Sequence, residues 1–381
     1  MQIKTITCHR VYNYGASLQA YALQHYLEEK GHHVEIIDFW PYAFHGRYNF
    51  FYVNSRFRYF SLLQRFPVLK FFYGLRFNRR MFKTYGRKGS FDKFEKQFLH
   101  LTDMSYSTSD ALKKEPPFAD VYIAGSDQIW NTDMPNGHES AFYLDFGDKT
   151  IRRIAYAASF GIPSVPDEYK NIISNRIHKL DFVSVREASG LNILKNMGIE
   201  NAVQVLDPVF LLSADEWRKC VLYDSKHYHF IDDKYILIYD FIGDSRIKQL
   251  AINAAQNLKC KLVSLNDFRT YHYVDYNINN AGPCEFLNLI EHACLVITNS
   301  FHATAFSVIF NKEFYTFSLS TQNSSSRMED FCHLLNLMER YNSTQIADNK
   351  ISYHEVNRTI NEQKYMSMRF INMGINFAEG L

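Results

Sequence analysis

Three polar residues directly follow an apolar run near residue 300, and they could carry acid–base chemistry. The run ACLVIT is followed by Asn299 and Ser300 and, one residue further on, by His302. These residues open the predicted helix FHATAFSVIF. A helix beginning here would turn unpaired backbone N–H groups and the positive end of its dipole toward an anion. A histidine in this place titrates near neutral pH and can act as a general acid or base. A purely structural histidine fits the same pattern, so the motif alone leaves both roles open.

A second polar group follows the apolar run ADVYIA. Gly125 permits a tight turn there, which places Ser126, Asp127 and Gln128, with Asn131 beyond them, near a predicted helix start. Such side chains suit a polyhydroxylated or anionic ligand. Asp127 could instead satisfy only the backbone N–H groups of a capped turn.

Two arginines stand where they could hold a phosphate or carboxylate. Arg186 follows the apolar run FVSV, and its guanidinium can grip such a group through two parallel hydrogen bonds. An ion pair with a neighbouring carboxylate is the alternative. Arg327 follows the polar run TQNSSS and precedes a predicted helix, so it could bring a second cation to the same site.

The elements that must position these residues begin with a strand at residues 2–7, a loop, a helix ending near Gly31, and a strand at 33–39. This unit has the size of a βαβ module in a parallel sheet. In open α/β sheets ligands bind beyond the carboxyl ends of the strands. Asn13 and Gly15 lie in the loop after the first strand, so we expect them to bind substrate.

The same alternation continues along the chain. The predicted strands are residues 119–125, 152–161, 181–187, 202–207, 234–241, 260–265, 293–300 and 313–319, and the later ones alternate with predicted helices near 245–257, 284–292 and 302–310. Residues 102–117 show no strand pattern and are expected to be a polar connection. Two successive α/β sets predict two Rossmann-like, doubly wound parallel-sheet domains facing a cleft, at residues 1–212 and 213–381. The last predicted helix could cross back to the first domain.

Composition limits the class of protein. The 381 residues suit about two domains, and 46% hydrophobic with 22% charged residues is typical of a globular protein. No run approaches the ~20 apolar residues of a membrane-spanning helix. The net charge of +2 conceals an insertion at residues 41–100 that has 13 Lys and Arg against 2 Asp and Glu, and 19 of the 61 aromatic residues.

This basic aromatic insertion, expected to contain two helical pieces split near Pro67, permits two interpretations. It could be an amphipathic surface that lies on an anionic bilayer, or its aromatic rings could be buried beneath a solvated basic face. No RNA-binding signature accompanies it, so we expect no nucleic-acid partner.

The chain start, MQIKTITCHRVYNYG, has no secretory signal pattern, and the six cysteines show no CxxC spacing. We therefore expect a cytoplasmic protein with reduced thiols. No metal-binding spacing is present. The nearest approach, His227 and His229 close to Asp232 and Asp233, is interpreted as a loop with chance histidines.

Several of these motifs in their order resemble the polysaccharide pyruvyl transferase family. They are NYGASLQAYAL, ADVYIAGSDQIWN, FVSVREASG, the Asp207-Pro208 pair, VITNSFHATAFSVIF and SSRMEDFCHLLNL, which span residues 10–340. The resemblance implies a fold like that of GT-B glycosyltransferases and transfer of a pyruvyl group from phosphoenolpyruvate to sugar hydroxyls. It also implies no metal or organic cofactor. By this resemblance Arg186 and His302 hold substrate and act in catalysis, and the GSDQ turn lines the cleft. The insertion at 41–100 matches no motif of the family that we recognise.

The expected reaction forms a pyruvate ketal on a sugar of a surface or capsular polysaccharide precursor, with a lipid-linked oligosaccharide as the expected acceptor. Arg186 and the helix start at Ser300 are expected to hold the donor's phosphate and carboxylate, with His302 as proton donor and Asp127 as base on the acceptor hydroxyl. The alternative enzyme is a GT-B glycosyltransferase that uses a nucleotide sugar. A non-catalytic module held to a membrane or nucleic acid by residues 41–100 is the third interpretation.

Overall fold

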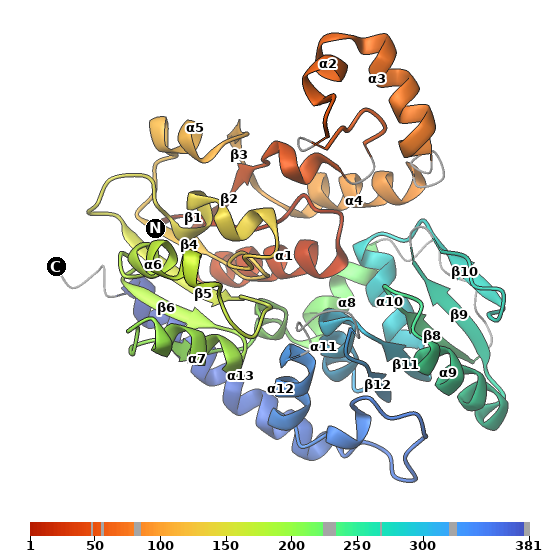
Figure 1. Ribbon diagram of the computed structural model, residues 1–381. Helices are drawn as coiled ribbons and strands as arrows, with labels where there is room; N and C mark the ends of the chain where they lie inside the picture. Colours follow the sequence, from red (N-terminus) through yellow and green to blue (C-terminus); the bar gives the residue numbers. More distant parts are fainter. Residues whose placement is uncertain are drawn as a thin grey trace.

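The computed structural model describes residues 1–46, 49–54, 57–79, 85–223, 234–266, 269–319 and 326–376. Within these ranges the chain forms two parallel sheets, one from each half of the chain, both flanked by helices (Figure 1). This arrangement confirms the predicted fold class. The boundary placed at residue 212 stays a prediction. The segment with His227, His229, Asp232 and Asp233 lies outside the described residues.

The first sheet has seven strands in the order β3-β2-β1-β4-β5-β6-β7, all paired in parallel. Its strands are β1 (Gln2–Ile6), β2 (His33–Phe39), β3 (Leu101–Tyr106), β4 (Val121–Ala124), β5 (Arg152–Ala158), β6 (Phe182–Val185) and β7 (Val203–Gln204). Helices α1 (Tyr14–Glu29), α5 (Ser109–Lys114), α6 (Asp167–Ile177) and α7 (Ala188–Asn196) connect them. The carboxyl ends of β1, β4, β5 and β6 therefore meet along one edge, and the predicted site residues follow these ends.

The second sheet has five strands in the order β10-β9-β8-β11-β12, also parallel. They are β8 (Tyr235–Tyr239), β9 (Lys261–Leu265), β10 (Tyr276–Ile278), β11 (Leu295–Thr298) and β12 (Phe314–Thr316). The helices of this half are α8 (Ala214–Tyr223), α9 (Ser245–Leu258), α10 (Pro283–His292), α11 (Phe301–Ile309) and α12 (Ser326–Leu334).

Two strands depart from the expectations. β3 lies within residues expected to be a polar connection, and β10 falls in a segment with no predicted strand. Both are edge strands, each paired on one side. An edge strand buries less of its surface than a central one, so its sequence need not carry the continuous apolar run that marks β4 or β11.

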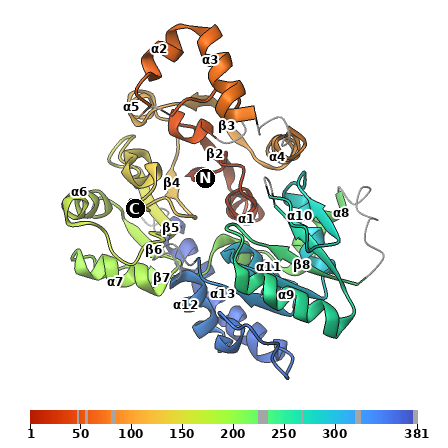
Figure 2. The same ribbon diagram turned by 45° about the vertical axis from the view of Figure 1, so that its right-hand side comes forward.

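The two halves share one hydrophobic core at their junction, and α1 lies at its centre. Asn13 caps this helix, since its Oδ1 accepts hydrogen bonds from the N–H groups of Gly15 and Ala16. The ring of Tyr14 stacks on Phe286 of the second half with 4.4 Å between centroids. Helix α1 is therefore buried on nearly every side, between the two sheets (Figure 2).

The long helix α13 (Tyr353–Asn376) follows the second half and packs on the first sheet. The Ser367 hydroxyl accepts a hydrogen bond from the Leu206 N–H at 2.8 Å, and Gly374 lies so close to Ile154 that a Cβ would approach it to 2.8 Å. This packing brings the end of the described chain close to the first sheet, as Figure 1 shows.

The insertion forms a group of helices beside the first sheet. After the short 3-10 helix η1 (Tyr42–Gly46) come α2 (Phe60–Arg65), α3 (Pro67–Tyr73) with a π-helical turn η2 (Gly74–Asn78), and α4 (Tyr85–Phe98). Pro67 stands at the first position of α3, so the predicted break at this proline is confirmed. Helix α4 packs into the shared core through Phe91 and Phe94, whereas α2 and α3 project outward (Figure 1).

Candidate active site

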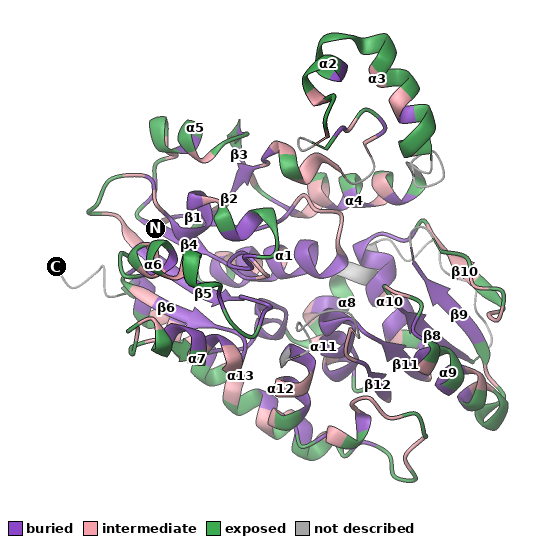
Figure 3. Ribbon diagram, viewed as in Figure 1, coloured by how far each residue is buried: buried purple, intermediate pink, exposed green. Residues whose placement is uncertain are grey.

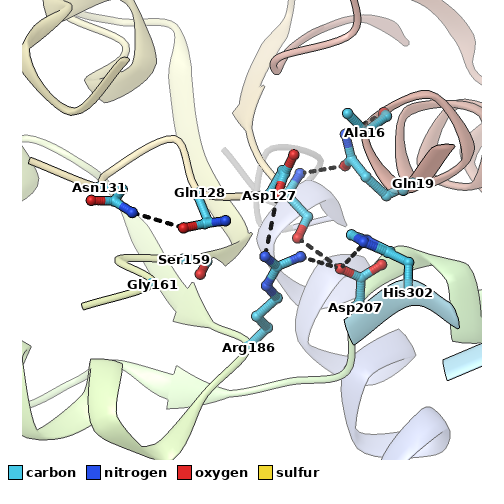
Figure 4. Close-up of polar contacts among 12 residues, drawn as sticks. Ala16, Gln19, Asp127, Gln128, Asn131, Ser159, Gly161, Arg186, Asp207 and His302 are labelled. Carbon is cyan, nitrogen blue, oxygen red and sulfur yellow. Dashed lines mark hydrogen bonds and ion pairs between the residues drawn. The ribbon is translucent and has the colours of Figure 1, made fainter. Parts of the chain in front are cut away.

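His302 lies in the first turn of α11, just after β11, as the sequence predicts. Ser300 caps the helix, and its hydroxyl accepts a hydrogen bond from the Ala303 N–H at 3.4 Å. The imidazole is nine-tenths buried, and its Nε2 lies 3.5 Å from Oδ2 of Asp207 in the first half of the chain. The contact thus joins the two halves of the molecule (Figure 4).

Gly15 explains how the imidazole fits there. A Cβ on Gly15 would lie 1.9 Å from Nδ1 of His302, far inside van der Waals contact. The first turn of α1 therefore leaves a space that only a glycine can provide, and the ring of His302 fills it. Gly15 does not line the cavity described below, so its place in the structure is beside the histidine rather than beside a ligand.

Asp207 is the centre of a buried cluster of charged residues. Its Oδ2 accepts a 2.6 Å hydrogen bond from Nη1 of Arg186 and lies 3.3 Å from the Ser126 hydroxyl oxygen, while Oδ1 accepts from the Val209 N–H. Burial by itself raises the pKa of this carboxyl, but His302, Arg186 and the Val209 N–H outweigh it and hold that pKa well below its ordinary value. Asp207 is therefore an anion at neutral pH.

Arg186 is almost completely buried among carboxylates. Besides Asp207, it donates from Nη2 to Oδ1 of Asp127 at 3.2 Å, and its Nε lies 3.7 Å from Oε2 of Glu187. Its guanidinium carbon lies 5.0 Å from the centre of the Phe301 ring. Burial lowers the pKa of Arg186, and the three carboxylates more than reverse this. Arg186 is not among the residues that line the cavity, and its direct grip on a substrate anion stays a prediction.

A cavity of about 430 Å³ opens between the two halves next to this cluster. Polar groups and apolar side chains share its wall, which consists of Cys8, Val11, Asn13, Ala43, Phe44, Gly46, Asp127, Gln128, Met134, Pro135, Asn136, Phe241, Asn299, Ser300, Phe301, His302, Leu319 and Arg327. This volume is in the range that holds small polar ligands. The N-terminus of α11 faces the same space, which favours an anionic ligand.

Arg327 is the buried cation in this wall. The residue is 9% exposed, and its Nε has no hydrogen-bond partner among the described residues. Burial, with Arg186 nearby, lowers the pKa of Arg327 to about 10, so it remains charged at neutral pH. A buried guanidinium with an unsatisfied nitrogen is suited to an anion that enters the cavity.

The turn after β4 divides the predicted residues into two groups. Ser126 is fully buried behind the wall, where its N–H donates to Oε1 of Gln19 at 2.8 Å and its hydroxyl donates to the Ala157 carbonyl at 2.6 Å. Asp127 and Gln128 reach the cavity. Oε1 of Gln128 accepts a 2.7 Å hydrogen bond from Asn131 (Figure 4). Ser126 therefore fixes the turn, and the next two residues face the ligand space.

The remaining predicted residues, Asn13, Asn299 and Ser300, all line the cavity. Asn299 also ties β11 to β8, because its Nδ2 donates to Asp240 at 2.7 Å and its Oδ1 accepts from the Phe241 N–H. Its amide is thus held in one orientation at the carboxyl edge of the second sheet.

Sequence analysis assigned no role to three residues of this region. Asp207 ends the predicted strand 202–207, and in the structure it contacts both Arg186 and His302. Glu187 accepts hydrogen bonds from the Ser159 hydroxyl and the N–H groups of Phe160 and Gly161, and so shapes the loop after β5. Cys8 lines the cavity with a thiol whose pKa is raised by burial and by Asp127. For Asp207 and Glu187 the available signal was a carboxylate at a strand end close to Arg186.

With this geometry established, comparison with known proteins gives the family. The family model described as "Polysaccharide pyruvyl transferase" matches residues 13–321. The chain belongs to the polysaccharide pyruvyl transferase family. The match includes His302, Arg186 and the turn after β4, and membership supports a transferase. Comparison with curated proteins gives no significant match.

Solved structures confirm that this family member has a GT-B-like fold. The UDP-GlcNAc 2-epimerase of Neisseria meningitidis bound to UDP-GlcNAc matches with a TM-score of 0.51 at 10% identity, covering 98% of this chain and 94% of the epimerase. The UDP-N-acetylglucosamine 2-epimerase of Rickettsia bellii gives a TM-score of 0.51 at 11% identity, covering 100% and 97%. At such identities the likeness concerns the fold alone.

Proposed function

We propose that this protein transfers a pyruvyl group from phosphoenolpyruvate to two hydroxyls of one sugar in a surface-polysaccharide precursor, forming a cyclic ketal. The observation that carries the proposal is the pairing of His302 with Asp207 at a cavity that also contains the buried cation Arg327. This site combines a proton donor with groups that attract an anion. Membership in the polysaccharide pyruvyl transferase family supports the same reaction class.

In the proposed reaction the proton of His302 moves to the CH₂ carbon of phosphoenolpyruvate, which becomes a methyl group. The first sugar hydroxyl forms a bond to C2, and the bond from C2 to the phosphate oxygen breaks. The second hydroxyl then closes the ketal. The two sugar hydroxyls release two protons. One returns to His302 and replaces the proton that His302 gave to the methyl group, and the other leaves with the phosphate. Asp207 stays ionised behind the histidine throughout.

Arg327 and the N-terminus of α11 are proposed to hold the phosphate and carboxylate of phosphoenolpyruvate. Their assignment follows from position, since both Arg327 and Ser300 line the cavity. Arg186 is proposed as a positioning residue that fixes Asp127 and Asp207. Asp127 lines the cavity and is the proposed base for an acceptor hydroxyl. We propose no metal or organic cofactor, and the described residues contain no group of three or more His, Cys, Asp and Glu side chains that could hold a metal ion.

The proposal is tested through the donor. Isothermal titration calorimetry should detect phosphoenolpyruvate binding to the wild type. Loss of a charged hydrogen bond in Arg327→Gln should weaken it by about 10- to 100-fold. Lys195→Gln, on the exposed surface of α7, is the matched control and should bind as the wild type does. In the presence of a panel of lipid-linked saccharides, the enzyme should release phosphate. Release of a nucleoside diphosphate from a sugar nucleotide, with no phosphoenolpyruvate binding, would instead support the glycosyltransferase alternative.

A further inference from the structure

The outward lobe of the insertion, residues 57–79, is largely exposed or only partly buried. Within it only Leu63 and Gly74 are buried (Figure 3). The exposed large apolar side chains of the lobe are Tyr59, Leu62, Phe66, Val68, Leu69, Phe71, Phe72, Leu75 and Phe77. Monomeric proteins seldom expose such a concentration of apolar side chains, and where they do, the patch marks a surface that binds something.

The apolar residues of α3 and η2 are arranged at helical spacing. Val68, Phe71, Phe72 and Leu75 follow the i, i+3, i+4, i+7 pattern of one helix face. In a globular protein that face normally packs on the core. Here it points away from the core, and Val68 and Phe72 are 67% and 60% exposed. The helix is therefore amphipathic in pattern. Phe71 contacts the ring of Phe50, with 5.7 Å between centroids, and Val68 and Phe72 stay exposed.

The lobe carries basic residues and no acidic residue of its own. Residues 57–79 contain Arg58, Arg65, Lys70, Arg76 and Arg79 and no Asp or Glu. Three guanidinium groups of the lobe lie over aromatic rings, at 5.4 Å for Arg58 on Tyr59, 5.9 Å for Arg65 on Phe66 and 5.2 Å for Arg76 on Phe77. No ion pair links these three arginines to a carboxylate of the described chain. Their charges are thus available to an external anion.

We propose that the lobe of residues 57–79 docks the protein on an anionic lipid bilayer. Aliphatic side chains such as Val68 and Leu69 gain free energy in hydrocarbon, which a nucleic acid does not offer, and the arginines gain at a surface of anionic headgroups. A second copy of the chain is a poorer occupant, because pairing of the same lobe would bring like charges together. None of the described helices has the length and apolar character that crossing a bilayer requires, so the contact is with the surface.

The lobe is connected to the cavity by a short chain of contacts. Ala43, Phe44 and Gly46 of η1 form part of the cavity wall. Tyr42 of the same turn donates a hydrogen bond to the Val53 carbonyl and accepts one from Gln64 of α2, each at 3.0 Å. A bilayer against the lobe would therefore lie near the segment that lines the site, which suits an acceptor carried on a lipid.

The test is co-sedimentation of the full-length protein with vesicles, without any substrate. This makes the outcome independent of the proposed transferase reaction. The wild type should bind vesicles of phosphatidylcholine mixed with phosphatidylglycerol and bind phosphatidylcholine alone far more weakly. Raising the salt from about 0.1 M to about 1 M, which shortens the Debye length from about 10 Å to about 3 Å, should weaken the binding.

Two variants separate charge from apolar contact. Arg65→Gln, Arg76→Gln and Arg79→Gln together should reduce the partition coefficient by on the order of 100-fold, at about fivefold for each charge. Val68→Ser with Phe72→Ser should reduce it at least about tenfold. The matched controls remove exposed groups elsewhere and should bind as the wild type does; they are Lys114→Gln, Lys149→Gln and Lys195→Gln together, and Tyr365→Ser with Met366→Ser.

Three results would overturn the proposal. The first is absence of binding to the anionic vesicles, or binding that both lobe variants leave unchanged. The second is self-association in sedimentation velocity that the lobe variants abolish, which would identify a second copy as the occupant. The third is lobe-dependent binding to an oligonucleotide with no binding to vesicles.

Discussion

Arginine has opposite surroundings in two regions of this protein, the cluster behind the cavity and the outward lobe. Arg186 is buried and faces three carboxylates, those of Asp127, Glu187 and Asp207. Arg58 and Arg76 of the lobe are exposed and lie over aromatic rings. A buried charge must be compensated within the protein, so the cluster is a fixed scaffold. Exposed charges without a carboxylate partner among the described residues support the proposal that the lobe binds a partner.

Arg327 combines features of these two regions. It is buried like Arg186, yet its Nε has no partner in the described part of the chain and it lines the cavity. We therefore propose three different roles for arginine in this protein: positioning, ligand binding and surface docking. The following predictions test whether the regions differ as this contrast requires.

The largest effect is expected at His302. Replacing a general acid typically costs about 10²- to 10⁴-fold in rate, so His302→Ala should lower turnover with phosphoenolpyruvate by that factor while the far-ultraviolet circular dichroism is unchanged. His333→Ala, an exposed histidine of α12, is the control and should keep full activity. Equal activity in both variants would remove His302 from the chemistry.

Asp207→Asn should damage stability more than any substitution in the lobe. Removing one partner of a buried ion pair costs about 3–5 kcal/mol, because Arg186 is left buried with less compensation. Urea unfolding at neutral pH measures this difference against the wild type. A cost below about 1 kcal/mol would show that the cluster is not the scaffold we describe.

The same substitution in a His302→Ala background gives a pH dependence of defined sign, because the histidine next to Asp207 no longer titrates there. Since the pKa of Asp207 is lowered by folding, its stabilising contribution is complete above the unfolded value of about 3.9 and is lost as the pH falls toward the folded value. The difference in unfolding free energy between His302→Ala and the double variant His302→Ala, Asp207→Asn should thus be constant from pH 8 to about 5 and decrease below about 4. A difference that grew on acidification would contradict the assignment.

Gly15→Ala tests the position of the imidazole without touching its chemistry. The new Cβ would lie 1.9 Å from Nδ1, so the ring of His302 must move. A displacement of about 1 Å at a catalytic group can cost about 10²-fold, and we expect a loss of that order in turnover. Gly89→Ala in α4, where a Cβ meets nothing within 4 Å, is the control. Similar turnover in the two variants would mean that the ring has another way to fit.

The smallest effect on the folded protein is expected in the lobe. Val68→Ser with Phe72→Ser removes apolar groups that are already in solvent, so the free energy of unfolding should change by no more than about 0.5 kcal/mol. Turnover on a detergent-soluble acceptor should equal that of the wild type. A loss of several kcal/mol would show that these side chains belong to a core, against their exposure in the structure.

The positions of several candidate site residues relative to the strands could be predicted, because strand ends carry local signals. The apolar runs that became β4, β6 and β11 predicted where Asp127, Arg186 and His302 stand, and the parallel sheets brought these ends together. The edge strands β3 and β10 were missed, since they carry no continuous apolar run, whereas the edge strands β7 and β12 were predicted.

Contacts between residues far apart in the sequence could not be predicted in this way. The sequence did not indicate which arginine would be neutralised by carboxylates and which would face the cavity, because Asp207 and Arg327 reach the site only through tertiary packing. The sequence likewise left open whether the aromatic rings of residues 41–100 are buried. In the structure their burial differs between helices. Phe91 and Phe94 of α4 are buried, and Phe72 and Phe77 of the lobe are exposed.

The proposed pyruvyl transfer is tested most directly by following the proton that is added to the CH₂ carbon of phosphoenolpyruvate. The reaction should be run with phosphoenolpyruvate and a lipid-linked saccharide in D₂O, and the ketal examined by NMR and mass spectrometry. The account predicts one solvent-derived deuterium in the ketal methyl group, because an exchangeable group of the enzyme protonates the CH₂ carbon. A methyl group without solvent deuterium, or a product that carries no pyruvyl group, would contradict it.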